Sequence, residues 1–475
     1  MKILMIAPEA EPFAKTGGLG DVLWSLPKAL SEQAEVRVII PKYQIIPEQY
    51  KDRMEFLGYT YVNLNWRSQY CGVFKLVLGN VTYYFIDNEY YFSGARMYGN
   101  YDLERYAFFS KACLEILPLI DFFPDIIHCH DWQTGLVPVL LDAHFKWDER
   151  YSKIKTVFTI HNLKFQGVHN KNFINDLLGL PDYYYTNDRM GKFGDANFMK
   201  GGIVFANYVT TVSPSYSEEI RQPAFGEGLD WLIGAKSDNL SGILNGVDYD
   251  VYSPQNNENI AFKYDKDNFA EGKRENKKAL QEKLGLPIRE DAPVISMVTR
   301  LTPQKGLDLL IQGMDRLMQR DLQLIILGTG DAEYENAMNH FAYHHSEKVR
   351  ACIFFSQELA HQIYAGSDMF LMPSLYEPCG LGQIISLAFG TLPIVRETGG
   401  LKDTVTSYNE HTGEGNGFSF NPYNPNDMIY TIDRALNIYK SPRLWEKIVH
   451  TAMECDFSWS RSAKQYMEIY NKIIK

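Results

Sequence analysis

Short apolar runs alternate with amphipathic segments along the first half of the chain. The run Ile3–Ala7 is followed by a glycine-rich turn, by a segment of helical periodicity from Asp21 to Gln33, and by the run Val36–Ile40. Continuous apolar runs of this length are typical of strands that are buried on both faces, so this order predicts a strand, a helix and a parallel strand. Pro27 lies inside the helical segment and predicts a bend there. Further runs of the strand type lie at residues 126–129, 156–160 and 208–212.

The same alternation is more regular in the second half. Runs of the strand type lie at residues 294–298, 322–327, 351–355, 369–372 and 392–395. Helical patterns lie between them at residues 307–318, 332–344, 358–365 and 381–389, and two more follow Pro442. Such alternation predicts parallel sheets with helices on both faces. We therefore expect an α/β fold of two doubly wound domains, with ligands bound in the cleft between them at the carboxyl ends of the strands.

The boundary between the two domains is expected near Asn245. A new series of elements begins after that residue, and the stretch from Gln255 to Glu282, which holds few large apolar residues, is interpreted as the boundary region. This division assigns residues 1–244 to the first domain and residues 245–455 to the second. The length of 475 residues agrees with more than one domain.

Composition and charge exclude several classes of protein. The 47 Lys and Arg residues against 58 Asp and Glu residues give a net charge of −11, whereas nucleic-acid binders and proteins of anionic membrane surfaces carry basic patches. A neutral partner suits this chain better. No secretory leader and no apolar stretch long enough to cross a membrane is seen. The six cysteines form no CxxC pair, so we expect free thiols and a cytoplasmic protein.

Aromatic residues make up 14% of the chain and include the clusters Tyr83–Phe85, Tyr90–Phe92 and Tyr183–Tyr185. Most of these rings are interpreted as core and strand packing. The alternative is that flat rings at the surface contact the faces of sugars.

The segment Lys15–Asp21, KTGGLGD, follows the first strand and opens a helix. Its glycines let backbone N–H groups approach an anion, and the helix N-terminus adds a favourable dipole. Lys15 favours an anionic ligand here, and the alternative is an ordinary strand-to-helix turn. Asp21 is interpreted as the N-cap of the helix.

Three loops of the second domain carry polar residues at strand ends. Glu377 follows the strand that ends at Met372, and Thr398–Gly400 follow the next one, so both lie at the carboxyl edge of the predicted sheet. Arg300 and Lys305 follow the strand at 294–298, and two cations at a strand end of an acidic chain favour a phosphate site. The alternatives are a solvated loop glutamate and ordinary surface charge.

Taken together, these segments resemble those of the bacterial glycogen synthases and plant starch synthases, which are glycosyltransferases that use ADP-glucose. The matching segments, which keep the family's order from end to end, are KTGGLGD (15–21), HDWQTGLVP (130–138), TIHNLKFQG (159–167), VTTVSPSYSEEI (209–220), FGEGLDWLI (225–233), LSGILNGVDYDVY (240–252), TRLTPQKGLDLL (299–310), MPSLYEPCGLGQ (372–383) and PIVRETGGLKDTV (393–405). Their joint occurrence is more specific than any single glycine loop.

The resemblance implies two Rossmann-like domains that face each other across a cleft, the GT-B arrangement, with a C-terminal helix at residues 456–475 that crosses back to the first domain. It also implies a transfer of glucose from ADP-glucose to the 4-hydroxyl at the non-reducing end of an α-1,4-glucan, such as glycogen or a maltooligosaccharide. The transfer would retain the anomeric configuration, release ADP, and need neither a metal ion nor a cofactor.

The resemblance further implies roles for individual residues. The residues implied to act in the reaction are His161, against the glucosyl ring, Glu377, beside its hydroxyls, and Arg300 and Lys305, at the diphosphate. The residues implied to bind ADP-glucose are Lys15, Gly17, Gly18, Phe355, Cys379, Gly380, Thr398, Gly399 and Gly400, with the Phe355 ring stacked on adenine.

Two positions depart from the family. Leu375 stands where many bacterial members carry Arg, and Glu397 stands where some carry a second Arg after Arg396. Both changes remove positive charge near the predicted phosphates, which bears on donor affinity and nucleotide preference.

Other interpretations of the sequence stay open. His128 and His130 lie on one face of a strand and could begin a zinc site, but no third and fourth ligand follow at a recognisable spacing. Two Asp-x-Asp segments, at 248–250 and 265–267, resemble those of metal-dependent glycosyltransferases and are interpreted as surface loops. A glucan phosphorylase would need a lysine that carries pyridoxal phosphate, and no matching segment is seen. A non-catalytic glucan-binding protein could keep the fold and the aromatic residues without the chemistry.

Overall fold

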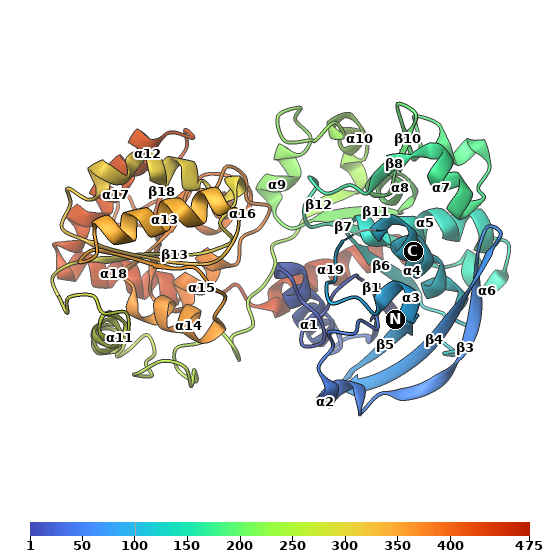
Figure 1. The fold of residues 1–475 in the computed structure, drawn as a ribbon, viewed down its shortest axis with the longest axis horizontal. Coiled ribbons are helices and arrows are strands. Elements are labelled where there is room, and N and C mark those ends of the chain that lie inside the picture. The colour runs from blue at the N-terminus through green and yellow to red at the C-terminus, as the bar shows by residue number, and fades with distance from the viewer. Residues whose placement is uncertain (100) are drawn as a thin grey trace. The chain divides into compact units, whose positions relative to one another are not determined.

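The computed structural model describes residues 1–99 and 101–475, and the chain divides into two compact units. The first unit comprises Met1–Gly246 together with the C-terminal segment Trp459–Lys475, and the second comprises Val247–Ser458. Each unit is an α/β fold built on one large sheet (Figure 1). Within the described residues no helix is long and apolar enough to cross a membrane.

The large sheet of the first unit has nine strands in the order β12-β11-β7-β6-β1-β2-β5-β4-β3. Neighbouring strands run parallel from β12 to β5, and β4 and β3 then add two antiparallel strands at the edge. The nine strands are β1 (Lys2–Ile6), β2 (Glu35–Pro41), β3 (Glu55–Leu64), β4 (Arg67–Leu78), β5 (Val81–Asp87), β6 (Ile126–His130), β7 (Lys155–Ile160), β11 (Tyr208–Thr211) and β12 (Leu240–Gly242). A small antiparallel sheet holds β8 (Val168–Asn170), β10 (Asp195–Asn197) and β9 (Gly191–Lys192). The five strands predicted for this half are confirmed as β1, β2, β6, β7 and β11.

Helices cover both faces of this large sheet (Figure 1). On β6 the side chain of His128 faces α19, where it bonds Tyr470, whereas the next residue, Cys129, lies near Cys113 of α4. The C-terminal helix α19 packs beside α1 and therefore completes the helix layer of the first unit. The helices of this unit are α1 (Gly18–Leu30), α2 (Glu48–Lys51), α3 (Glu89–Phe92), α4 (Asp102–Glu115), α5 (Leu136–Leu140), α6 (Glu149–Ser152), α7 (Lys171–Leu178), α8 (Phe198–Phe205), α9 (Pro214–Glu219), α10 (Asp230–Ala235) and α19 (Trp459–Ile474).

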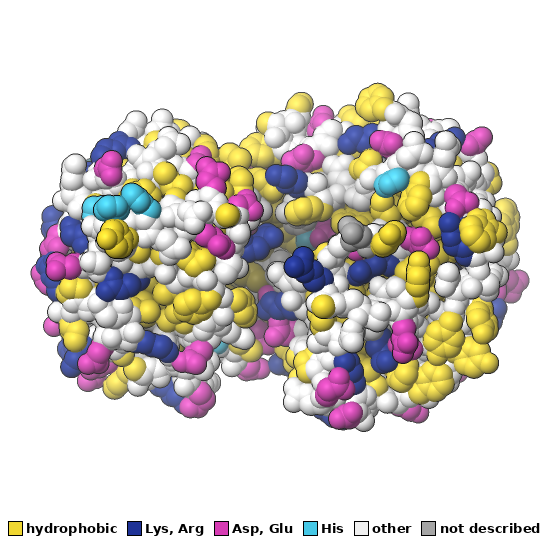
Figure 2. All heavy atoms as spheres, in the orientation of Figure 1, with side chains coloured by type: hydrophobic (Ala, Val, Ile, Leu, Met, Phe, Trp, Pro, Cys, Tyr) yellow, Lys and Arg dark blue, Asp and Glu magenta, His cyan; other side chains and the backbone are white. Residues whose placement is uncertain are grey.

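The expectation of an all-parallel sheet is wrong for β3 and β4. These edge strands alternate exposed and buried side chains: Tyr59 and Tyr61 are each 58% exposed, whereas Val62 and Leu64 are buried. Figure 2 shows hydrophobic side chains gathered at the surface over these strands. A strand with one solvated face lacks the continuous apolar run of a buried parallel strand, so the sequence pattern predicts neither β3 nor β4.

Most of the aromatic clusters belong to the core. Tyr83, Tyr84 and Phe85 on β5 are all buried, and in the other two clusters only Tyr90 and Tyr183 are strongly exposed. The interpretation as core packing is therefore confirmed for most of these rings.

The sheet of the second unit has six strands, all parallel, in the order β15-β14-β13-β16-β17-β18. The strands are β13 (Val294–Val298), β14 (Gln323–Leu327), β15 (Val349–Cys352), β16 (Met369–Met372), β17 (Leu392–Arg396) and β18 (Phe418–Phe420). All five strands predicted here are present. The strand expected at 351–355 begins and ends earlier, as β15, so Phe355 lies in the loop that follows it.

In Figure 1, α12, α13 and α17 lie over one face of this sheet and α11, α14 and α15 over the other. The helices are α11 (Phe269–Lys283), α12 (Leu307–Leu317), α13 (Ala332–His344), α14 (Gln357–Gly366), α15 (Gly382–Ala388), α16 (Gly399–Thr404), α17 (Pro425–Tyr439) and α18 (Pro442–Met453). Helices on both faces of a parallel sheet make this a doubly wound unit, as predicted.

One local expectation needs correction. The stretch Gln255–Glu282 is not only a boundary region, since it contains most of α11, which packs against α14 within the second unit. The polar composition of this stretch is overridden by the packing of α11. Pro27 lies inside α1, which continues to Leu30, as the helical segment predicts.

Candidate functional site

The carboxyl ends of neighbouring parallel strands bring the predicted site residues together within each unit. In the first unit the loops after β1, β6 and β7 share one edge of the sheet, and in the second unit the loops after β13, β15, β16 and β17 do. The first group of residues is Lys15, Gly17, Gly18 and His161. The second group is Arg300, Lys305, Phe355, Glu377, Cys379, Gly380, Thr398, Gly399 and Gly400.

A buried carboxylate holds the glycine-rich loop of the first group. Glu9, only 2% exposed, accepts hydrogen bonds from the backbone N–H groups of Thr16 (3.0 Å) and Gly20 (3.1 Å) and from the Thr16 hydroxyl (2.7 Å). Burial raises the pKa of Glu9, and these hydrogen bonds oppose the increase. The space beside the Gly17 backbone is open, because a Cβ at this position would meet no atom within 4 Å. No side chain caps the N-terminus of α1. The loop therefore leaves an exposed helix N-terminus of the kind that binds anions.

Lys15 lies between two carboxylates in this loop. Its Nζ is 2.8 Å from Oε2 of Glu11 and 2.6 Å from Oδ1 of Asp21. The interpretation of Asp21 as the N-cap is wrong, since Gly17 occupies that position and Asp21 lies in the first turn. Burial raises the pKa of Asp21, and the charge of Lys15 opposes the increase. The Lys15 ammonium is thus held at the mouth of the loop by the acidic groups around it.

His161 lies directly after β7 and is fixed from both its backbone and its ring. Its backbone N–H donates to Oδ1 of Asp131 at 2.7 Å, and its ring Nε2 lies 2.9 Å from Nδ1 of His130. Burial lowers the pKa of His161 to about 3, so the ring is neutral near pH 7. Asp131, after β6, has φ 58° and ψ 177°, a conformation that costs a residue other than glycine about 1–3 kcal/mol.

Asp131 is a candidate site residue to which the sequence analysis gave no role. Burial raises its pKa to about 7, the backbone N–H groups of His161 and Asn162 oppose the increase, and the nearby Glu9 adds to it. Strain and a displaced pKa in one side chain are typical of functional positions. Its place in the HDW segment directly after a buried strand is the signal that could have found it.

Asp131→Asn is expected to increase the free energy of unfolding more at pH 8 than at pH 5. The pKa of this carboxyl is about 7 in the folded protein, against about 3.9 in an unfolded chain. Between these values the unfolded state binds fewer protons, so wild-type stability falls as the pH rises from about 4 to about 7 and stays lower above it. Asparagine keeps an acceptor oxygen and does not ionise, so the free energy of unfolding of the variant does not decrease in this way as the pH rises.

Urea unfolding of wild type and variant at pH 5 and pH 8 measures the difference. Asp238→Asn, at an exposed residue, removes one charge elsewhere and serves as the matched control. A gain of the same size at both pH values, or a gain equal to that of the control, would contradict the expectation.

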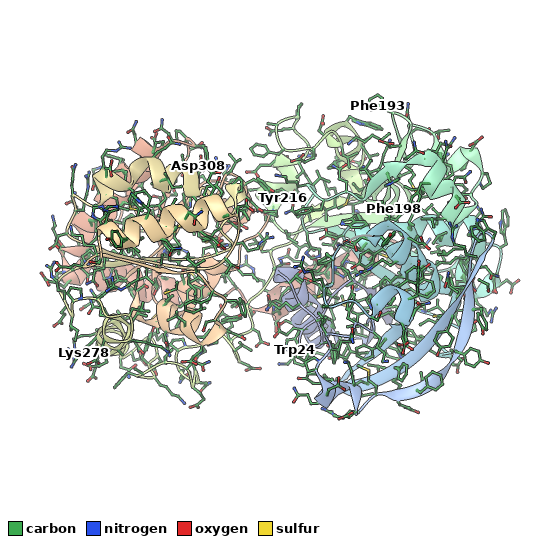
Figure 3. The ribbon with its side chains drawn as sticks, viewed as in Figure 1. Trp24, Phe193, Phe198, Tyr216, Lys278 and Asp308 are labelled. Atoms are coloured by element: carbon green, nitrogen blue, oxygen red, sulfur yellow. The ribbon has the colours of Figure 1, made fainter. Side chains whose placement is uncertain are left out.

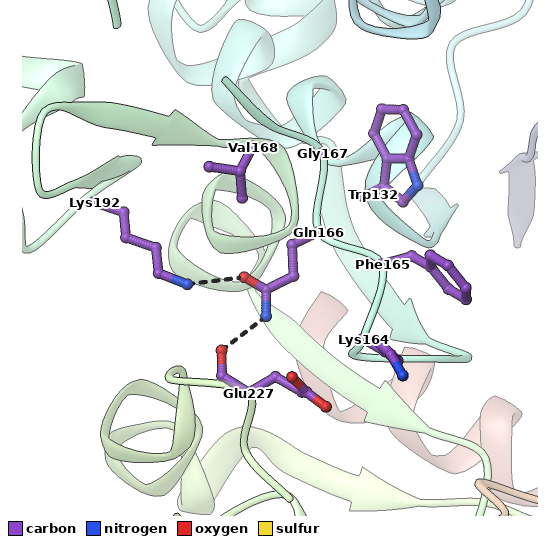
Figure 4. A pocket seen from close by; sticks show the side chains of 8 residues that line it. All are labelled: Trp132, Lys164, Phe165, Gln166, Gly167, Val168, Lys192 and Glu227. Atoms are coloured by element: carbon purple, nitrogen blue, oxygen red, sulfur yellow. Dashed lines mark hydrogen bonds between the residues drawn. The ribbon is translucent and has the colours of Figure 1, made fainter. Parts of the chain in front are cut away.

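A pocket of about 430 Å³ opens in the first unit beside these loops. Figure 4 shows the ring of Trp132 and that of Phe165 on one side, and Lys192, Gln166 and Glu227 on the other. Gln166 donates to the backbone oxygen of Glu227 at 3.1 Å and accepts from Lys192 at 3.4 Å. Aromatic faces with hydrogen-bonding groups opposite them suit a polyhydroxylated ligand.

Gly167 sets the floor of this pocket. Its φ is 63°, and a Cβ at this position would lie 2.2 Å from the indole of Trp132, so only glycine lets the indole pack against the chain. Phe193, 94% exposed, lies at the tip of the β9–β10 hairpin next to Lys192 and points away from the unit (Figure 3). The sequence analysis did not single out this pocket, because its residues come from three loops and two short strands.

In the second group, Lys305 and Glu377 form an ion pair at the strand ends. Nζ of Lys305 is 2.7 Å from Oε2 and 3.0 Å from Oε1 of Glu377, and the hydroxyl of Ser374 donates to Oε2 at 3.0 Å. Glu377 is 6% exposed. The alternative of a solvated loop glutamate is therefore excluded.

A close approach of two loops produces this pair. Gly306 has φ 72°, and a Cβ there would lie 2.0 Å from the backbone oxygen of Pro373. The backbone N–H of Leu375 also donates to the backbone oxygen of Gln304 at 2.9 Å. The loop after β13 thus packs on the loop after β16, which places Lys305 next to Glu377.

A second close approach joins the loop after β16 to the loop after β17. Gly399 has φ 45°, and a Cβ there would lie 2.0 Å from the backbone oxygen of Glu377. The backbone N–H of Gly400 donates to that oxygen at 3.1 Å, and a Cβ at Gly400 would lie 2.0 Å from the backbone oxygen of Cys379. The structure therefore brings Glu377, Cys379, Thr398, Gly399 and Gly400 together, as the strand order predicts.

Arg300 and Phe355 are the exposed members of the second group. Among the residues that the structure describes, no carboxylate or other side chain pairs with the Arg300 guanidinium, which lies in the exposed loop after β13. Phe355 is 89% exposed in the loop after β15, a strand separated from β13 only by β14. Both side chains lie at the same edge of the sheet, and each can bind a ligand without breaking a contact inside the protein.

The two positions that depart from the family differ in their surroundings. Leu375 is 42% exposed. Glu397 accepts a hydrogen bond from the Ser419 hydroxyl at 2.7 Å. The neighbouring Arg396 is buried and donates to the backbone oxygens of Ser374 and Leu375, so its charge is used to hold the loop that carries Glu377.

The histidine pair that could begin a zinc site is engaged otherwise. His128 and His130 are buried with ring centroids 4.2 Å apart, but His128 bonds Tyr470 and Thr159, and His130 bonds His161. In the described part of the chain, no group of three or more His, Cys, Asp or Glu side chains is arranged to hold a metal ion.

Comparison with known proteins agrees with this geometry. Residues 2–235 match the family model of the starch synthase catalytic domain, and residues 279–449 match that of the group 1 glycosyl transferases. The chain is 51% identical to the glycogen synthase of Lachnospira eligens, with 99% of each chain covered, and 51% identical to that of Bacillus cereus, with all of each chain covered.

Solved structures give the same result for the fold. The catalytic domain of starch synthase IV from Arabidopsis thaliana, solved with bound ADP and acarbose, superposes with a TM-score of 0.92 at 33% identity over 99% of each chain. Sucrose-phosphate synthase from Thermosynechococcus elongatus shares the fold, with a TM-score of 0.64 at 18% identity, and covers 99% of this chain and 98% of its own.

Proposed function

The chain belongs to the family of glycogen and starch synthases and is a glycosyltransferase, and on this premise we propose that its donor is ADP-glucose. The proposed reaction transfers glucose, with retention of configuration, to the 4-hydroxyl at the non-reducing end of an α-1,4-glucan, and releases ADP. The six cysteines are free thiols, in keeping with a cytoplasmic enzyme.

The observation that carries this proposal is the cation group of the second unit. Arg300 has no internal partner within the described residues, and Lys305 is held rigidly by Glu377. Breaking the bond between the anomeric carbon and the phosphate oxygen leaves a growing negative charge on the diphosphate. Cations fixed at that position stabilise the transition state more than the ground state.

The carboxylates do not suggest a covalent intermediate. Retention in a glycosidase needs a nucleophilic carboxylate opposite a second one, but Glu377 is buried and neutralised by Lys305. Oδ1 of Asp131 accepts two backbone N–H groups. We propose instead that the acceptor hydroxyl attacks from the face that the diphosphate leaves, with a phosphate oxygen taking the hydroxyl proton.

The pocket of Trp132 and Phe165 is the proposed acceptor site. A glucan presents flat sugar faces ringed by hydroxyls, which match the two rings and the opposite groups of Gln166, Lys192 and Glu227. The solved structure of starch synthase IV from Arabidopsis thaliana, with ADP and acarbose bound, supports a nucleotide and an oligosaccharide-like ligand in this family.

ADP-glucose is expected to give a higher kcat/KM than UDP-glucose with glycogen as acceptor and EDTA present. The exposed ring of Phe355 can stack on adenine, and a stack of this kind contributes about 1 kcal/mol. Phe355→Ala should therefore lower kcat/KM for ADP-glucose about fivefold. Initial rates with the two donors, for wild type and variant, test both statements.

Tyr343→Ala, which removes an equally exposed ring on α13, is the control and should leave the rates unchanged. Equal or better use of UDP-glucose would overturn the donor assignment. An unchanged kcat/KM in Phe355→Ala would remove that ring from the donor site.

A further inference from the structure

Within the described residues, His130 is the one buried histidine that bonds His161, the histidine predicted to contact the sugar. It ends β6, pairs in register with Thr159 of β7, and lies within 2.9 Å of the His161 ring, which follows β7. We propose that His130 is a positioning residue whose Nδ1–H donates to Nε2 of His161, so that His161 keeps its proton on Nδ1 and can donate it to a sugar hydroxyl. The identity of the sugar rests on the proposed function.

Burial keeps both histidine rings of this pair neutral. His130 is fully buried, and burial lowers the pKa of both rings well below the ordinary value. Each ring is therefore neutral near pH 7 and carries one N–H. Only one of the two facing nitrogens can hold a proton, so the hydrogen bond has a single donor.

The surroundings of the other His130 ring nitrogen, Nε2, indicate whether His130 or His161 donates the hydrogen bond. Its Nε2 is buried and has no hydrogen-bond partner among the described residues. If His161 were the donor, the His130 proton would sit on that Nε2 as an unpaired buried N–H, and such groups are rarer in folded proteins than unpaired acceptors. The assignment with His130 as donor leaves only a lone pair unmatched.

The second nitrogen of His161 is the one that a ligand can use. Nδ1 makes no hydrogen bond within residues 1–99 and 101–475, and the side chain is not fully buried. The backbone N–H of His161 is held separately by Asp131 at 2.7 Å. His130 and Asp131, two consecutive residues at the end of β6, thus fix the ring and the backbone of the same histidine.

Nitrogen NMR of the imidazole rings in the ligand-free full chain is the first test. In wild type we expect His161 to be protonated on Nδ1. His130→Ala removes the donor and should shift the His161 proton toward Nε2. His130→Asn places an amide N–H near the position of the imidazole Nδ1–H and should restore the wild-type pattern. Proton on Nε2 in the wild-type ring would overturn the proposal.

His128→Asn is the matched control. His128 is as buried as His130 and its ring packs against that of His130 at a tilt of 31°, but it bonds Tyr470 and Thr159 instead of His161. This variant should lower thermal stability and leave the His161 proton on Nδ1. A tautomer change in this variant equal to that of His130→Ala would mean that any loss of packing has the same effect, which would overturn a specific role for His130.

Kinetics provide the second test. His130→Ala should lower kcat/KM about tenfold, the size of one neutral hydrogen bond, and His130→Asn should recover most of it. With donors in which one glucose hydroxyl at a time is replaced by hydrogen, the tenfold effect should vanish for the donor that lacks the hydroxyl bound by His161. An equal effect with every donor, or no rescue by asparagine, would contradict the proposal. If wild type transferred no glucose at all, the proposed function would fail while the NMR result still decided the role of His130.

Discussion

Arg300→Gln is expected to lower kcat by about two to three orders of magnitude, the usual effect of removing one group that stabilises transition-state charge. The guanidinium is exposed and has no partner among the described residues, so the substitution breaks no internal contact. Thermal stability should therefore stay at the wild-type value. A much lower kcat with unchanged thermal stability is the result expected for a residue that binds a charged ligand.

Steady-state rates with saturating ADP-glucose and glycogen, together with thermal unfolding, measure both quantities. Lys278→Gln removes a cation from an exposed position of α11 (Figure 3) and is the matched control, with no effect expected on the rate. A variant that kept most of the wild-type kcat would exclude Arg300 from the diphosphate site. A large loss of stability would show that the guanidinium has a structural role.

The parallel core of both units could be predicted from the sequence because buried parallel strands carry their signal locally. In Val294–Val298 every position except Ser296 is apolar, and the strand β13 has the same bounds. The edge strand β3 could not be found in this way, since polar residues such as Thr60 and Asn63 interrupt its apolar residues. Its place is set by pairing with β4, a contact that lies outside any short window of sequence.

The candidate site residues also differ in how far the sequence alone could predict them. Residues that directly follow a predicted strand, such as Arg300 and Glu377, could be assigned to the sheet edge from the strand order alone. The Lys305–Glu377 pair could not, because it depends on Gly306 packing against Pro373, 67 residues away along the chain. Asp131 gives no signal as a residue type, and its backbone strain and raised pKa exist only in the folded protein.

Lys305→Gln and Glu377→Gln are expected to separate the two roles of their ion pair. Lys305→Gln leaves a buried carboxylate without its cation, which costs about 3 kcal/mol of stability. It also removes a charge from the proposed diphosphate site, so kcat should fall by about two to three orders of magnitude. Glu377→Gln removes the anchor of Lys305 and should lower both stability and rate. Its loss of stability should be smaller, because the Lys305 side chain is more exposed, 14% against 7% for Glu377.

The double variant Lys305→Gln/Glu377→Gln decides between function and structure. With both charges gone, no unpaired charge remains buried, so the free energy of unfolding should return close to the wild-type value, and the cycle should show a coupling energy of at least about 3 kcal/mol. The rate should stay low, because no cation remains at this position to stabilise the leaving diphosphate. Urea unfolding and steady-state kinetics on the four proteins give the whole cycle. Recovery of kcat along with stability would mean that the pair only holds the loops together, and it would leave Arg300 as the proposed diphosphate-binding cation of the second unit.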